Sequence, residues 1–100
     1  MDLQEVTNVK RFEYKVPGGK LLRAKLEIVN DRITSIQLSG DFFMEPETDL
    51  EELETKLTGF KAEPLYVEQT VVSFFTSHKT VMTGARPKDF AHVINQAIKA

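Results

Sequence analysis

Cysteine is absent from the sequence, and this removes two kinds of structural support. Neither disulfide bonds nor cysteine-ligated zinc can hold the chain together, so its stability has to come from packing. A chain without cysteine is compatible with a reducing compartment, and we expect a cytoplasmic protein. One hundred residues are enough for one domain with a single hydrophobic core.

Long hydrophobic runs and a strong excess of one charge are also missing. No apolar run is longer than three residues, so no segment is expected to span a membrane. The first residues, Met1-Asp2-Leu3-Gln4-Glu5, lack the basic start and the apolar stretch of a signal peptide. The net charge of -2 provides no electrostatic footprint for nucleic acid, which we therefore do not expect as a partner.

Alternation with period two predicts three strands in the first half of the chain. The residues expected on the apolar face are Phe12, Tyr14 and Val16, then Leu22, Ala24, Leu26 and Ile28, then Thr34, Ile36, Leu38 and Gly40. This pattern is typical of an antiparallel sheet with one buried face. The connectors Pro17-Gly18-Gly19-Lys20 and Asn30-Asp31 are short and contain turn-forming residues, so consecutive strands must pair antiparallel. We predict a three-stranded antiparallel meander.

The period changes near residue 48, and three helices are predicted after it. Thr48 and Glu51 resemble a capping box, and Gly59 suits the position after a helix end. Pro64 and Pro87 each suit the first turn of a further helix. Strands followed by helices indicate an α+β fold, with the three helices packed on one face of the meander. We interpret residues 1–100 as one domain and expect residues 1–8 to be frayed.

No group of residues forms a recognisable catalytic set. Gly18-Gly19-Lys20 partly resembles a phosphate loop, but Leu21 stands where that loop needs serine or threonine, and a strand follows it. A hairpin turn is the preferred interpretation, with the alternative that Lys20 projects onto a partner or its ligand. His78 and His92 lack acidic or cysteine residues at ligand-like spacing, and we expect them to serve packing.

Two other features have a structural and a functional interpretation. Four acidic residues begin the first helix, and we expect a solvated helix face that matches the helix dipole rather than a site. They are Asp49, Glu51, Glu52 and Glu54. Phe42 and Phe43 are adjacent, so on a strand they point to opposite sides. Either both rings are buried by the helices, or one of them is an aromatic anchor for a partner chain.

The central part of the sequence resembles the C-terminal accessory domain of lipoate–protein ligase. The run from Ile33 to Phe43 contains the Gly-Asp-Phe-Phe strand end of that domain, and 49–59 matches its leucine-glutamate helix ending in glycine. Pro17-Gly18-Gly19-Lys20-Leu21-Leu22-Arg23 is similar to its hairpin, and Arg86-Pro87-Lys88-Asp89-Phe90 is loosely similar to its last helix start. The similarity covers roughly residues 9 to 99.

Because the chain has 100 residues and begins with Met1, it looks like the separate small subunit of the two-protein, archaeal form of the ligase. The resemblance then implies a heterodimer in which a catalytic chain binds ATP, magnesium and lipoate. That chain makes lipoyl-adenylate and transfers the lipoyl group to lysines of carrier domains. The small subunit is needed for activation, binds no cofactor alone and is inactive alone. The alternative is a protein-binding adaptor module of similar fold.

The resemblance and the turn chemistry together suggest which residues meet the catalytic chain or help to close its active site. Glycine lets a backbone approach closely, lysine adds a flexible positive charge, and the strand end adds an aromatic side chain. The predicted residues are Gly18, Gly19, Lys20, Gly40, Asp41, Phe42 and Phe43. No catalytic residue and no metal ligand is expected in this chain.

Overall fold

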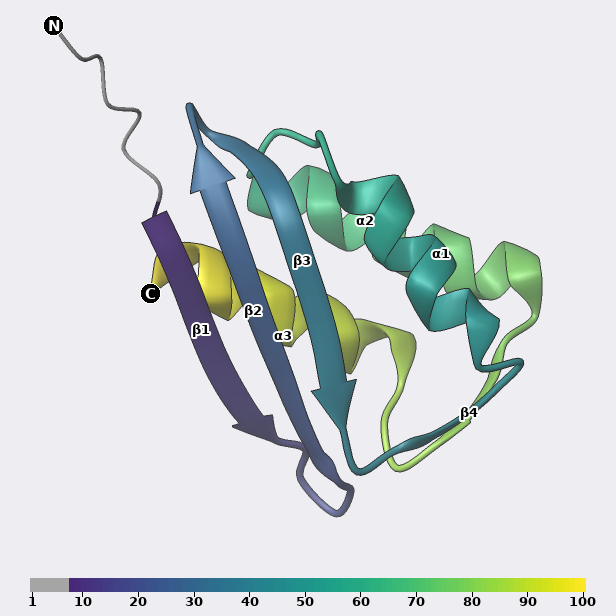
Figure 1. The fold of residues 1–100 in the computed structure, drawn as a ribbon. Coiled ribbons are helices and arrows are strands. Elements are labelled where there is room, and N and C mark those ends of the chain that lie inside the picture. The colour runs from purple at the N-terminus through teal and green to yellow at the C-terminus, as the bar shows by residue number, and fades with distance from the viewer. Residues whose placement is uncertain (1–7) are drawn as a thin grey trace, which may run out of the picture.

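Residues 8–100 are described by the computed structural model, and their three longest strands form one antiparallel sheet (Figure 1). The strands are β1 (Asn8–Lys15), β2 (Leu21–Val29) and β3 (Arg32–Gly40), in the spatial order β1-β2-β3. The predicted meander is confirmed. Residues 1–7 lie outside the description, and with them almost all of the segment that was expected to be frayed.

The turn between β2 and β3 is formed by two residues with positive φ, Asn30 (52°) and Asp31 (64°). A β-bulge follows it, because Ile28 pairs with Ile33 while Glu27 pairs with Ser35, which leaves Thr34 as an extra residue. The bulge moves the inward-facing set by one residue, so Ile33 is buried and Thr34 is exposed. The prediction that Thr34 lies on the apolar face is therefore wrong.

Three helices cover one face of the sheet, as predicted. They are α1 (Thr48–Leu57), α2 (Pro64–His78) and α3 (Pro87–Lys99). In Figure 1, α3 lies behind the sheet, where it packs on β1 and β2, while α1 packs beside β3 and α2 packs on α3. The core lies between the two layers and includes Leu22, Leu26, Phe75, Phe90 and Ile94, all less than 3% exposed.

Proline and glycine mark the helix boundaries mostly as expected. Pro64 and Pro87 are the first residues of α2 and α3, and Gly59 follows the end of α1 with a φ of +95°. The predicted capping box at Thr48 is wrong. Glu47 holds the N-cap position with helical angles and no side-chain cap, because the chain already turns after Pro46, whose carbonyl accepts the Asp49 amide at 3.1 Å.

A second, two-stranded sheet was not predicted. β4 (Phe43–Glu45) pairs antiparallel with β5 (Val81–Thr83), so β5 interrupts the expected succession of helices between α2 and α3. Each strand has only three residues, too few for an alternation to be recognised in the sequence. This ribbon lies beyond the end of β3. Its strand β4 connects β3 to α1, and its strand β5 lies in the segment between α2 and α3 (Figure 1).

The acidic residues of α1 differ from the expected solvated face. Asp49 is only 4% exposed and accepts a hydrogen bond of 2.5 Å from the Thr80 hydroxyl, which lies just before β5. Glu54 accepts the Leu38 backbone N–H of β3 at 2.7 Å. Two of the four carboxylates therefore fasten α1 to neighbouring elements, because the helix lies directly against β3 and the ribbon. Within residues 8–100, no helix has the length and hydropathy needed to cross a bilayer.

Candidate functional site

The β1–β2 turn and the β5–α3 loop meet at one end of the sheet. The Lys20 backbone N–H donates to the Gly84 carbonyl oxygen at 2.9 Å. A Cβ placed on Gly19 would lie 2.5 Å from the same oxygen, so a larger residue at Gly19 would force the two segments apart. The turn thus depends on glycine for close contact with a distant loop, beyond its own local geometry.

Gly84 is constrained even more strongly. Its φ is +93°, a conformation that favours glycine, and a Cβ on it would lie 2.5 Å from Cγ of Lys20. The same Cβ would lie 3.7 Å from Cα of Phe42. Gly84 therefore lies between both segments predicted to form the site, the 17–20 turn and the 40–43 strand end, and a side chain on it would contact both.

The strand end is shaped by a close backbone contact of its own. A Cβ on Gly40 would overlap the Leu21 carbonyl oxygen, which also accepts the Asp41 N–H at 3.0 Å. Phe42 is half-buried and meets the ring of Phe90 edge to face, with 5.0 Å between centroids. Phe42 is therefore part of the packing that positions the site, and α3 provides its partner.

Phe43 points the other way and is 70% exposed. On the β4–β5 ribbon it stands opposite Thr83, while Val81, 66% exposed, stands opposite Glu45. Side chains two residues apart on a strand share a face with those directly opposite on the paired strand. Phe43 and Val81 are therefore the apolar part of an outward face that also carries Glu45 and Thr83, and Met44 faces inward with 5% exposure. The interpretation that both phenylalanines are buried is wrong, because β4 leaves the main sheet before Phe43.

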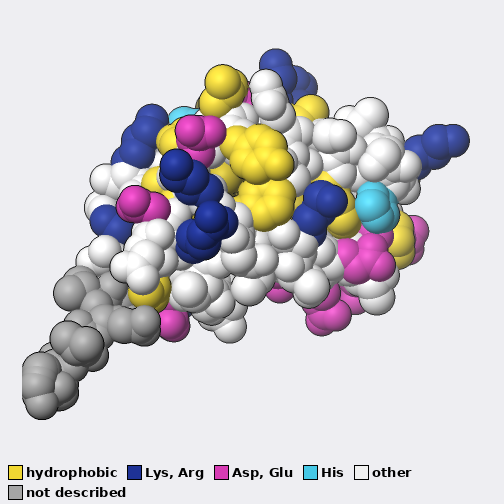
Figure 2. All heavy atoms as spheres, turned by 90° about the horizontal axis from the view of Figure 1, so that it is seen from above, with side chains coloured by type: hydrophobic (Ala, Val, Ile, Leu, Met, Phe, Trp, Pro, Cys, Tyr) yellow, Lys and Arg dark blue, Asp and Glu magenta, His cyan; other side chains and the backbone are white. Residues whose placement is uncertain are grey.

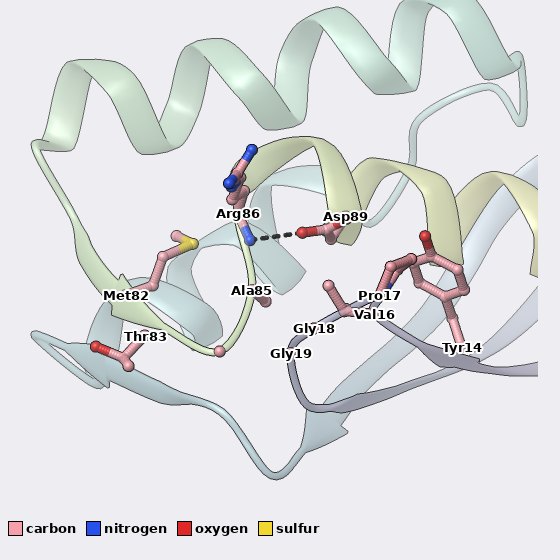
Figure 3. A pocket seen from close by; sticks show the side chains of 11 residues that line it. Tyr14, Val16, Pro17, Gly18, Gly19, Met82, Thr83, Ala85, Arg86 and Asp89 are labelled. Carbon is pink, nitrogen blue, oxygen red and sulfur yellow. Dashed lines mark hydrogen bonds between the residues drawn. The ribbon is translucent and has the colours of Figure 1, made fainter.

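A groove of about 620 Å3 runs between the turn and the loop (Figure 3). The residues that line it are Tyr14, Val16, Pro17, Gly18, Gly19, Met82, Thr83, Gly84, Ala85, Arg86 and Asp89. The carboxylate of Asp89 accepts the Arg86 backbone N–H at 2.8 Å and so occupies the start of α3 (Figure 3). The exposed Arg86 and Lys20 side chains bring positive charge to this end, and neither forms an ion pair with a residue of the described chain.

Sequence reasoning missed the loop partner of this site, residues 82–86. Of the predicted residues, Gly18 and Gly19 line the groove, Lys20 and Phe42 contact Gly84, and Phe43 lies on the adjoining ribbon. Asp41 is exposed beside them. The available signal was Gly84 itself, an isolated glycine just before a helix start, but nothing local indicates which segment approaches it.

The histidines have packing contacts. His78 stacks on Phe74 with 3.9 Å between centroids, and its Nε2 lies 3.5 Å from a carboxylate oxygen of Glu52. The ring of His92 lies against the ring of Tyr14, with 4.5 Å between their centroids. Among residues 8–100, no three histidine, cysteine or acidic side chains are grouped as metal ligands.

A second exposed apolar surface lies at the opposite end of β3. Phe60 and Tyr66 stack with 5.2 Å between centroids, and the neighbouring Leu65 is 64% exposed. Seen from this end, hydrophobic side chains gather near the centre with lysine and arginine around them (Figure 2). The two surfaces are separated by the length of the sheet, because Arg32 at the start of β3 bridges to Lys61, while Phe43 follows the end of β3.

The fold and the groove define a small two-layer α+β domain whose most constrained surface is an assembly of glycine contacts beside an exposed aromatic residue. Comparison with known proteins identifies the family to which this domain belongs. The model of the family described as bacterial lipoate protein ligase C-terminus matches residues 6–94, and the chain belongs to that family. The resemblance stated from the sequence is confirmed.

Two comparisons with proteins of one organism add detail to the family match. The chain is 32% identical over 74 residues to lipoate-protein ligase A subunit 2 of Thermoplasma acidophilum, a match that covers 74% of this chain and 76% of the relative. It is also similar to a chain in the solved structure of a bipartite lipoate protein ligase and its E2 lipoyl domain from that organism. That match has a TM-score of 0.71 and 28% identity, and it covers 91% of this chain and 97% of the other. The predicted α+β class is confirmed.

Proposed function

We propose that this chain is the small accessory subunit of a two-protein lipoate–protein ligase and forms a heterodimer with a separate catalytic chain. The observation that carries the proposal is the extent of the structural match. It covers 97% of a chain that belongs to a bipartite ligase, so the correspondence is with a whole polypeptide. The curated relative is itself called subunit 2 of a ligase, which supports the same division of labour.

In the proposed complex, the catalytic chain binds lipoate, ATP and magnesium. The lipoate carboxylate attacks the α-phosphorus of ATP, pyrophosphate leaves, and lipoyl-adenylate forms. A lysine amine of a carrier domain then attacks the acyl carbon, and AMP leaves. The small subunit contributes to the first step by positioning and by excluding water, because adenylation needs an aligned triphosphate and a dry site.

The end-of-sheet site supplies the parts that such a role requires. Phe43 and Val81 offer an apolar anchor, and burial of an aromatic side chain is a frequent source of binding energy between subunits. The hydrogen bond to Gly84 fixes the backbone of Lys20, so its ammonium group extends from a rigid support. A lysine held in this way suits charge stabilisation of a phosphate on the partner chain.

A second candidate function is supported by the Phe43–Val81 surface alone. An exposed aromatic residue on a short ribbon also fits an adaptor module that binds a chain with no ligase activity. The two functions differ in the partner: the ligase subunit acts on adenylation, and the adaptor does not.

The test is a reconstitution with the catalytic chain encoded in the same genome. Lipoyl-adenylate and pyrophosphate are measured for each chain alone and for the equimolar mixture. We expect little product from either chain alone and rapid formation by the mixture, which should elute as a 1:1 complex. Adenylate made by this chain alone, or full activity of the catalytic chain without it, would rule out the accessory role.

A further inference from the structure

One face of the main sheet is covered by no helix or strand of the described chain. In Figure 1, α3 lies behind the β1-β2-β3 sheet and α1 and α2 lie beside β3, while the front face of the sheet is open. Four basic side chains and two carboxylates point from β1 and β2 toward this face, a net charge of +2. They are Arg11, Lys15, Arg23 and Lys25, with Glu13 and Glu27. The whole chain has a net charge of -2, so the face is positive against the overall balance.

Two of the four cations are already engaged within the domain. Arg23 pairs with Glu13 at 3.3 Å, and the Lys15 ammonium donates to the Gly19 carbonyl at 2.8 Å. Arg11 and Lys25 remain. They stand directly opposite each other across β1 and β2, and neither lies within 4.0 Å of a carboxylate among residues 8–100.

A cross-strand pair of like charges destabilises a sheet. Arg11 and Lys25 are exposed, so packing within the domain does not require two cations here. An acidic side chain at either position would pack equally well and would attract the remaining cation across the strands. The like-charge pair is therefore better explained by a binding partner that brings negative charge to Arg11 and Lys25.

The space around this pair fits a carboxylate side chain. A shallow hollow of about 250 Å3 lies on the face, and Glu13, which is paired with Arg23, is part of its lining. Arg11, Arg23 and Lys25 line it as well, together with Gln37 and Ser39 of β3. These groups offer positive charge and hydrogen-bond donors to an acidic side chain that enters from outside. The aromatic residues of β1 are on the other side, since Phe12 and Tyr14 pack against the core. The face thus lacks the stacking platform that single-stranded nucleic acid prefers.

The chemistry of the face also separates it from a permanent subunit contact. Among the described residues, the exposed large hydrophobic side chain on this face is Val9, near the start of β1. Permanent interfaces are more apolar, whereas charged and polar surfaces increase the rate of encounter with partners that come and go. In a ligase, the partner that must arrive and leave in every catalytic cycle is the carrier domain.

We propose that the open face of the β1-β2-β3 sheet is a docking surface for the lipoyl carrier domain, which it attracts through carboxylates that pair with Arg11 and Lys25. The inference rests on the proposed function and assigns to this chain a role in the transfer step, separate from its role in adenylation. The docking is electrostatic and reversible, so it depends on salt concentration.

The decisive variant is Lys25→Glu, which places a carboxylate opposite Arg11. A structural role predicts an unchanged or higher Tm, because a repulsive pair becomes an attractive one. A docking role predicts that carrier binding weakens about tenfold or more at low salt and that the difference shrinks at high salt. The matched control is Lys88→Glu, which makes the same charge change at an exposed position in the first turn of α3. The double variant R11Q/K25Q removes both charges without introducing a new one.

The experiment uses the reconstituted two-chain ligase and an unlipoylated E2 lipoyl domain as the probe. Binding of the probe, its KM in transfer and the rate of adenylate formation without it are measured for all four proteins. We expect Lys25→Glu and R11Q/K25Q to impair binding and raise the KM while adenylation stays at the parent rate. Equal probe binding by all four proteins would overturn the docking surface. So would parent binding to a DNA or RNA oligonucleotide that Lys25→Glu abolishes. Absence of any stimulation of adenylation by the parent would refute the proposed function instead, and the binding data would still decide the docking surface.

Discussion

Replacement of Phe43 by alanine should weaken the complex with the catalytic chain while leaving this domain folded. A phenylalanine side chain covers roughly 150–250 Å2 when fully buried. Because 70% of Phe43 is exposed, about 140 Å2 of it remains for a partner to cover. At about 25 cal/mol per Å2, that burial contributes about 3.5 kcal/mol before the costs of association.

Alanine would retain part of this contact, so we expect a loss of about 2 kcal/mol in binding, which raises Kd about 30-fold. The effect on stability should be much smaller, below about 1 kcal/mol, because little of the ring is covered within the domain. Titration calorimetry with the catalytic chain gives the Kd, and urea denaturation of the isolated variant gives the free energy of unfolding.

Leu65→Ala is the matched control for this measurement. Leu65 is 64% exposed, so the change removes a similarly exposed hydrophobic side chain, but it lies at the other end of the sheet. If the anchor is Phe43, Leu65→Ala should bind like the parent. A Phe43→Ala variant that folds and binds with the parent Kd would refute the reasoning. If Leu65→Ala weakens binding more than Phe43→Ala does, the interface lies at the Phe60–Tyr66 end.

Three further changes test the site and its support. Lys20→Ala should leave the complex intact but lower adenylate formation about tenfold or more if the ammonium faces phosphate, and a parental rate would remove Lys20 from the site. Gly84→Ala should destabilise the fold by about 2 kcal/mol in urea denaturation, since it combines a positive φ with contact to Lys20; parental stability would mean that the loop adjusts freely. Asp49→Ala should cost about 1–3 kcal/mol because it leaves the Thr80 hydroxyl without its acceptor, whereas Asp49→Asn keeps an oxygen there and should cost less.

The sequence allowed the main sheet and the helices to be predicted because their signals are local and repeated. Alternation over eight or nine residues identifies a strand, and proline in the first turn identified the starts of α2 and α3. The error at Thr34 has a visible cause. Ile33 and Ile36 both have to face the core, and only an extra residue between them permits it.

The site was predicted in part for the same physical reason. The 17–20 turn and the 40–43 strand end were recognisable from their own residues, but their meeting at Gly84 depends on packing between distant segments. The ribbon that exposes Phe43 forms only when three residues after β3 pair with three residues before α3. Alternation showed that Phe42 and Phe43 point in opposite directions, and only that pairing decides which of them is outside.

The two edges of the main sheet differ in their exposure to other chains. Along β3, Glu54 accepts the Leu38 N–H, and the segment after α1 bonds to Ile33, through the Phe60 carbonyl at 2.8 Å and the Gly59 N–H at 2.6 Å. Backbone groups that would otherwise template a foreign strand are thus occupied. Among residues 8–100, no strand pairs with the outer edge of β1. Self-association of this domain at high concentration should therefore begin at β1, where charge repulsion between copies is the remaining protection against aggregation.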